Sequence, residues 1–332
     1  MKNSLLSGVP LLMFLPILLF ALPNKLEGEA LHGIKRVLFL GDSITYSGQY
    51  VEYIELIFRT KFPKRKIEFL NVGLPSETCC GLSEPNHAGG AFPRPNVQDR
   101  LVRALELTKP DLVVACYGMN DGIYYPFSEE RFEKFKQGVR LIKSRVEKAH
   151  AELLLMTPPV FDPVPIASSV YPIGKEAYGS DHPFDNYDDA LAKYSKWLMS
   201  QKRSGWNVID IHTPMKNYLN AERARNPEFK FANDGVHIND EGHWMIAERI
   251  LATWKFPAPT QTFRELRNRA KQEPEIAKLI EVVHHRQTLL KDAWLTEIGH
   301  KRPGMTRGLP IAAALLEAEK LDRSLETKSL DR

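Results

Sequence analysis

Short apolar runs alternate with longer amphipathic stretches along most of this chain, and no other feature constrains the fold as strongly. The first run spans residues 36–40, and apolar side chains then recur at helical spacing from Val51 to Phe58. Four further runs fall at 67–70, 111–116, 153–156 and 207–210. This alternation is typical of a parallel sheet with helices on both faces. The sequence therefore predicts an α/β fold around a five-stranded parallel sheet.

The segments between the runs are predicted to be helices and one long loop. Helices are expected around 101–105, over about 128–149 and 240–254, and before residue 207. The Pro-rich stretch 160–183 has no clean period, so we expect a surface loop of the kind that often lines a site.

The composition changes after residue 256. Residues 255–259 look like a boundary, after which the chain is helical and charged. An apolar stripe indicates that this tail packs on something, and it consists of Ile276, Ile280, Val283, Leu290 and Trp294. We predict a main domain over residues 31–256 and a helical C-terminal extension of unknown role over 257–332.

The first thirty residues are typical of an export signal. Lys2 precedes an apolar run from Leu5 to Leu22, and Gly28 and Ala30 offer the small residues that a signal peptidase reads. We predict a signal peptide over residues 1–30 and a periplasmic or secreted protein. The run is close to the roughly 20 residues that span a bilayer, so an uncleaved N-terminal anchor is the alternative. A membrane is an expected partner only through such an anchor.

Charge and cysteine content exclude several classes of protein. Lys and Arg total 45 against 41 Asp and Glu, a net charge of +4, which is too balanced for a nucleic-acid-binding surface. Cys79, Cys80 and Cys116 form no disulfide framework and no zinc-ligand spacing; one pair with Cys116 is possible, but buried thiols are favoured. The histidine clusters at 181–185 and 281–285 match no ligand spacing either, so no metal is predicted.

Two separated segments carry residues that could take part in catalysis. Gly41-Asp42-Ser43 follows the first run directly, so Ser43 is expected at the carboxyl end of the predicted sheet, where open α/β folds bind ligands. By itself, Gly41-Asp42-Ser43 is also an ordinary turn and helix cap. Asp234 and His237 share one loop before the last helix, where the carboxylate can fix an imidazole that takes the Ser43 proton. Alone, that loop is equally well read as a solvated turn.

Donors for a developing oxyanion are expected from the same sheet edge. Gly73 follows the second run and lets a backbone amide approach the reacting centre. Asn120 follows the third run and offers a neutral side-chain donor. With the Ser43 amide, these residues make three candidate donors.

Four blocks together resemble the SGNH hydrolases, also called the GDSL esterase and lipase family. The blocks stand in the family's order over residues 35–254, and they are Gly41-Asp42-Ser43-Ile44-Thr45, Asn71-Val72-Gly73, Gly118-Met119-Asn120-Asp121 and Asp234-Gly235-Val236-His237.

The resemblance implies a role for each matching residue. Ser43 is then the nucleophile, His237 the base and Asp234 its orienting acid, and the oxyanion hole consists of Ser43, Gly73 and Asn120. It also implies a flavodoxin-like three-layer α/β/α fold and neither a metal nor an organic cofactor. The chain departs from the pattern at Ser76, where many members have glycine, and in its tail.

These residues predict a two-step acyl transfer on a short-chain ester. Because we predict that the protein is exported, we expect its substrate to be a carbohydrate ester, such as an acetylated polysaccharide, and not a long-chain lipid. Tyrosines in the candidate site loops would suit stacking on sugars, and they are Tyr124, Tyr125, Tyr171 and Tyr178. A thioesterase, a lysophospholipase, an acetyltransferase or a non-catalytic glycan-binding module are the alternatives.

Replacing Ser43 or His237 with Ala is expected to abolish nearly all ester turnover while leaving folding intact, because each change removes a reacting group and little else. Turnover is measured with p-nitrophenyl acetate, and folding by circular dichroism. A folded Ser43→Ala protein with undiminished turnover would contradict the assignment.

Overall fold

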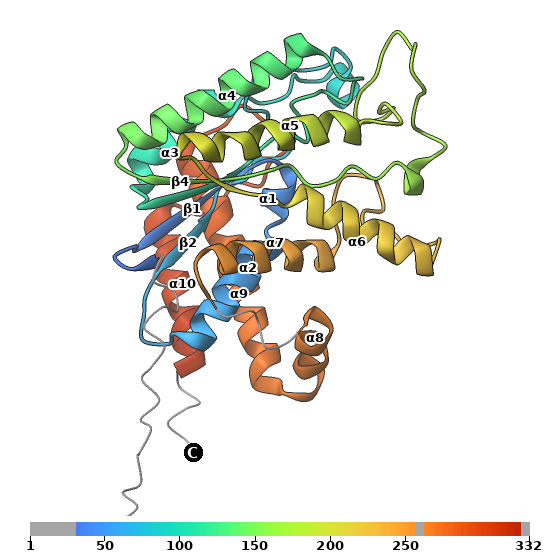
Figure 1. Cartoon of the computed structure of the whole chain (residues 1–332). Coiled ribbons are helices and arrows are strands. Elements are labelled where there is room, and N and C mark those ends of the chain that lie inside the picture. Colours follow the sequence, from blue (N-terminus) through green and yellow to red (C-terminus); the bar gives the residue numbers. More distant parts are fainter. Residues whose placement is uncertain (1–30, 257–261, 327–332) are drawn as a thin grey trace, which may run out of the picture.

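Five parallel strands form one sheet in the part of the chain that the computed structural model describes, residues 31–256 and 262–326 (Figure 1). Neighbouring strands follow the order β2-β1-β3-β4-β5, which is the flavodoxin-like order. The strands are β1 (Arg36–Gly41), β2 (Glu68–Asn71), β3 (Leu112–Cys116), β4 (Glu152–Met156) and β5 (Asn207–Ile209). The predicted fold class and sheet are confirmed, and each strand end lies within one residue of the predicted run.

Helices cover both faces of the sheet, which gives the predicted three-layer α/β/α arrangement (Figure 1). Side chains of β1 alternate between two buried cores, because successive residues of a strand point to opposite faces. The first core includes side chains of α2 (Gln49–Lys61), α6 (His212–Arg225) and α7 (Asp240–Thr253). The second includes side chains of α3 (Leu101–Thr108), α4 (Glu129–Lys148), α9 (Pro274–Ile298) and α10 (Ile311–Glu326). α5 (Asp188–Ser200) contributes to both cores.

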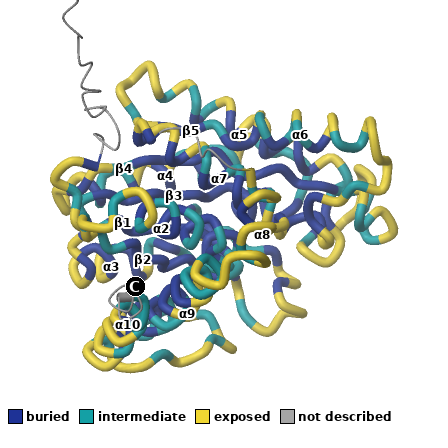
Figure 2. Tube along the Cα trace, turned by 90° about the horizontal axis from the view of Figure 1, so that it is seen from below, coloured by how far each residue is buried: buried dark blue, intermediate teal, exposed yellow. Residues whose placement is uncertain are grey.

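The C-terminal helices share their buried core with the sheet. Leu290 and Trp294 of α9 are buried in the second core, so part of the predicted apolar stripe does pack. The Gln287 amide donates to the Phe69 carbonyl of the edge strand β2 at 2.9 Å and to buried Glu55 of α2. α8 (Phe263–Gln272) packs beside α9. Figure 2 shows the strands dark blue along most of their length, as expected for a sheet covered on both faces.

The long loop between β4 and α5 is only partly a surface loop. Val160, Phe161 and Asp162, at its start, are buried, whereas Ile173 further along is 71% exposed. The prediction of a surface loop over 160–183 is therefore wrong for its first residues, since Val160 and Phe161 share the first core with Val236.

The described chain begins at the edge of the sheet that is opposite to the carboxyl ends of the strands. Leu31 is fully buried there, and its carbonyl accepts a hydrogen bond from Arg65 Nη2 at 2.7 Å. The predicted signal peptide, residues 1–30, lies outside the described residues. Within the part of the chain that is described, no helix has the length and apolar character needed to cross a membrane.

Leu290→Ala is expected to lower the free energy of unfolding by about 2–5 kcal/mol, because it leaves a cavity in the second core. Leu316→Ala on α10 is the matched control, since that side chain is 51% exposed and its loss should cost less than about 0.5 kcal/mol. Urea unfolding followed by circular dichroism measures both. Equal stability of the two variants would show that α9 does not complete the core.

Candidate active site

Ser43 lies where the sequence predicts, directly after β1 at the carboxyl edge of the sheet. It is the first residue of the short helix α1 (Ser43–Ser47). Asp42 caps this helix, because its Oδ1 accepts a hydrogen bond from the Ile44 amide at 3.0 Å. Asp42 is buried, and its removal from water raises the pKa of its carboxyl to about 7. The cap therefore fixes the turn that presents Ser43.

Ser43, His237 and Asp234 form a continuous chain of hydrogen bonds. Ser43 Oγ lies 2.8 Å from His237 Nε2, and His237 Nδ1 lies 2.5 Å from Asp234 Oδ2. A carboxylate only accepts, so Nδ1 carries the imidazole hydrogen and donates it to Asp234. Nε2 is then free to accept the hydrogen of the Ser43 hydroxyl. This is the arrangement that turns a serine into a nucleophile.

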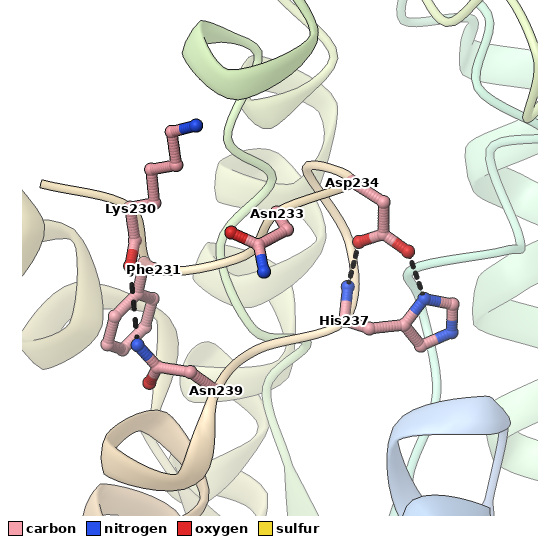
Figure 3. A pocket seen from close by; sticks show the side chains of 6 residues that line it. All are labelled: Lys230, Phe231, Asn233, Asp234, His237 and Asn239. Atoms are coloured by element: carbon pink, nitrogen blue, oxygen red, sulfur yellow. Dashed lines mark hydrogen bonds and ion pairs between the residues drawn. The ribbon is translucent and has the colours of Figure 1, made fainter. Parts of the chain in front are cut away.

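The loop that carries Asp234 and His237 is held by backbone hydrogen bonds. Asp234 Oδ1 accepts from the His237 amide at 2.8 Å (Figure 3), and it also accepts from the Val236 amide at 3.0 Å. The Asp162 amide of the long loop donates to the Gly235 carbonyl at 2.8 Å. The buried start of that loop thus supports the position of His237.

Asp234 and His237 shift the pKa of one another in opposite directions. The hydrogen bond to Asp234 raises the pKa of His237 above its ordinary value, against the smaller effect of partial burial. Burial favours a higher pKa for Asp234, but the hydrogen bonds from His237 and Val236 together hold that pKa below its usual range. The side chains remain 50% and 56% exposed for His237 and Asp234, so the pair faces open solvent.

His243 lies near this site and is a poor base. Its Nε2 is 3.2 Å from the hydroxyl of Ser47, which itself donates to the Ile44 carbonyl, so the His243 ring must be the donor. The ring is buried and stacked on Tyr50, and burial lowers the pKa of His243 to about 3. These facts agree with the sequence-based choice of His237 as the base.

The amide of Gly73 is already engaged. It donates to Asn71 Oδ1 at 2.9 Å, and one amide hydrogen serves one acceptor. Glycine is needed here for another reason, because a Cβ would lie 2.3 Å from the Tyr46 nitrogen of α1. A donation from Gly73 to an oxyanion requires that the bond to Asn71 break, and it stays a prediction.

The side chain of Asn120 has one defined orientation. Its Oδ1 accepts from Arg94 Nη1 and from the Tyr124 hydroxyl, each at 3.0 Å, so the amide nitrogen must point the other way. Nδ2 donates one hydrogen to the Glu77 carbonyl at 3.1 Å and keeps the second. The sequence did not reveal Arg94, which lies in an aperiodic loop between two prolines, and we find no local signal that could have done so.

Two of the four tyrosines expected to stack on sugars are unable to do so. Tyr124 is 2% and Tyr178 is 5% exposed, so neither ring offers a face to a ligand. Tyr125 and Tyr171 are half-buried, and Tyr171 stacks on His182 at a ring distance of 4.4 Å. The packing of the site loops decides which of these tyrosine rings are accessible to a ligand, and the sequence does not show this packing.

A pocket of about 440 Å³ adjoins the catalytic loop (Figure 3). It is lined by Lys230, Phe231, Asn233, Asp234, His237 and Asn239. Five of its six lining residues have polar or charged side chains, and Asp234 and His237 are two of them.

The three cysteines are free thiols; Cys79 and Cys116 are buried, and Cys80 is half-buried. Burial raises the pKa of each thiol, which keeps it protonated. Over residues 31–256 and 262–326, no three His, Cys, Asp or Glu side chains gather as metal ligands would.

Comparisons with known proteins identify one family. The GDSL-like Lipase/Acylhydrolase family matches residues 39–245. A search among curated proteins found no match. Among solved structures, a mutant of Axe2, an acetyl-xylooligosaccharide esterase from Geobacillus Stearmophilus, is 19% identical with a TM-score of 0.48, over 68% of this chain and 97% of its own. The gut microbial diltiazem-metabolizing enzyme BT4096 is 21% identical with a TM-score of 0.48, over 67% of this chain and 47% of its own, so the match spans about half of that enzyme.

The pKa of His237 is expected to be higher in the wild type than in an Asp234→Asn variant, because the neutral amide no longer stabilises the imidazolium. Activity should therefore fall as the pH drops through a midpoint above about 6.5, since protonated His237 accepts no proton. Nuclear magnetic resonance of the imidazole ring measures the titration in both proteins, and kcat/KM against pH measures the acid limb. The same midpoint in both proteins would contradict the role of Asp234.

Proposed function

The chain belongs to the GDSL-like Lipase/Acylhydrolase family, and on this premise we propose that it is an exported serine esterase acting on short-chain acyl esters. The observation that carries the proposal is the hydrogen-bond chain from Ser43 through His237 to Asp234. A hydroxyl becomes an effective nucleophile when an aligned imidazole takes its proton. The family match also confirms the resemblance to SGNH hydrolases found in the four sequence blocks.

The proposed reaction has two acyl-transfer steps. Ser43 Oγ attacks the ester carbonyl carbon while His237 Nε2 takes the hydroxyl proton, and the bond to the alcohol breaks as His237 returns this proton to the leaving oxygen. Water then loses a proton to His237 and attacks the acyl-enzyme, which releases the acid and restores the Ser43 hydroxyl. Asp234 stabilises the imidazolium in both steps.

The negative oxygen of each tetrahedral intermediate needs donors that are already in place. The Ser43 amide stands beside the attacking oxygen. Asn120 supports this role because its oxygen is occupied and its nitrogen keeps one hydrogen after donating to Glu77.

The Ser76 amide is a candidate for the third donor in place of Gly73. Among residues 31–256 and 262–326, nothing accepts the Ser76 N–H. Arg94 Nη1 contacts both the Ser76 carbonyl, at 3.4 Å, and Asn120 Oδ1, so Ser76 and Asn120 are neighbours. Ser76 also has φ of 67°, a left-handed conformation that glycine adopts without strain, which accounts for the glycine found there in many members.

The surroundings of His237 support a polar alcohol as the leaving group. The catalytic pair is half exposed, and the lining of the adjoining pocket includes Lys230, with its ammonium group, and Asn233, with its amide. Sugar hydroxyls can hydrogen-bond to both kinds of group. Together with the predicted signal peptide, these polar groups favour a carbohydrate ester as the substrate, such as an acetylated polysaccharide.

Other acyl acceptors and donors would use the same three residues. A thioesterase would release a thiol in place of the alcohol, and a lysophospholipase would cleave a lipid ester. An acetyltransferase would pass the acyl group to a sugar hydroxyl in place of water. A non-catalytic glycan-binding module has no need for an aligned Ser43 and His237, so their 2.8 Å contact favours an enzyme.

The protein lacking residues 1–30 is expected to hydrolyse p-nitrophenyl acetate much faster than the butyrate and the octanoate, because the proposed carbohydrate esters carry short acyl groups. The Ser43→Ala variant is the control for background hydrolysis. Octanoate as the best substrate would contradict the short-chain proposal. If all three esters are inert, a serine-reactive phosphonate decides, since a binding module would not be labelled at Ser43.

A further inference from the structure

A buried ion pair stands next to the proposed oxyanion hole. Arg94 and Glu84 have side chains that are 2% and 1% exposed. Arg94 Nε and Nη2 each donate to one Glu84 carboxylate oxygen at 2.6 Å, which is a bidentate pair. A buried ion pair is weak evidence for stability, because removing two charges from water costs about as much as their attraction returns. The pair therefore calls for a reason beyond stability.

The remaining Arg94 nitrogen supplies that reason. Nη1 donates to Asn120 Oδ1 at 3.0 Å, and the guanidinium lies over the Tyr124 ring at 5.2 Å. The Tyr124 hydroxyl donates to the same Asn120 oxygen. Two donors on one oxygen, one of them charged, fix the amide plane and exclude the flipped orientation, in which an amide N–H₂ would face two donors.

We propose that Arg94 is a positioning residue that acts through Asn120 on the oxyanion, an inference that rests on the proposed esterase function. The positively charged guanidinium that donates to Asn120 Oδ1 draws electron density through the amide group. This makes the Asn120 Nδ2–H group a stronger hydrogen-bond donor. This strengthening matters most when the oxygen of the substrate becomes negative, so it favours the transition state over the bound ester.

Arg94 acts from behind Asn120 and not on the substrate directly. Glu84 occupies two of its nitrogens, and the third is directed to Asn120 and the Ser76 carbonyl. Glu84 thereby holds the guanidinium in place and balances its charge. Tyr124 is the neutral counterpart on the same oxygen, and its hydroxyl makes no other hydrogen bond among the described residues.

The test is a double-mutant cycle between Arg94→Met and Asn120→Ala, with kcat and KM measured on p-nitrophenyl acetate. Arg94→Met alone should lower kcat by about tenfold or more, up to the roughly hundredfold that loss of the Asn120 donor costs, while KM changes by less than about twofold. In the Asn120→Ala background, Arg94→Met should lower kcat by less than about threefold, because its target is gone.

Tyr124→Phe and Arg286→Met are the two accompanying variants. Tyr124→Phe keeps the packing and should lower kcat by about three- to tenfold, again only when Asn120 is present. Arg286→Met removes a buried ion pair with Glu55 between α9 and α2 and should lower the melting temperature without changing kcat by more than about twofold. If Arg94→Met does not fold because Glu84 is left unpaired, Arg94→Met combined with Glu84→Gln takes its place in the same cycle with Asn120→Ala.

Losses that multiply in the double mutants would overturn the inference, because they would mean that Arg94 and Tyr124 act independently of Asn120. Unchanged kcat in a folded Arg94→Met protein would do the same. A wild type without Ser43-dependent hydrolysis would instead remove the proposed function, and with it this inference.

Discussion

A parallel sheet is stable only when both of its faces are covered, and this requirement organises the whole molecule. Side chains of β1 enter two separate cores, and each core needs its own layer of helices. A long irregular segment connects the edge strand β2 to α3, and α9 packs beside β2. The bonds of Gln287 to the Phe69 carbonyl and to Glu55 satisfy polar groups that would otherwise be buried alone. The C-terminal extension is thus a structural part of the layer around the sheet.

The same sheet brings distant residues together. All five strands run in one direction, so the segments that follow them meet at one edge. Ser43 and His237 are separated by 194 positions, yet their side chains are in hydrogen-bond contact. This much was predictable from sequence, because apolar runs locate the strands and the polar blocks stand directly after them. Asp234 was predictable as well, since three residues on a turn are close in any fold.

What the sequence did not reveal depends on contacts between loops. The segment from Asn71 to Arg100 has no periodic pattern, so neither Arg94 beside Asn120 nor the engaged Gly73 amide could be expected. Burial of Tyr124 follows from packing in the same region. The apolar stripe of the tail predicted that it packs, but the choice of β2 and α2 as its partners is a property of the complete sheet.

The chain enters the sheet at one edge, and the residues proposed for catalysis lie at the other. Leu31 is anchored at the amino edge, and Ser43 stands just beyond the end of β1, which at about 3.3 Å per residue is roughly 20 Å long. The point at which the described chain begins and the candidate catalytic edge are therefore separated by the full length of the central strand, so a label or fusion placed before Leu31 would leave Ser43 accessible.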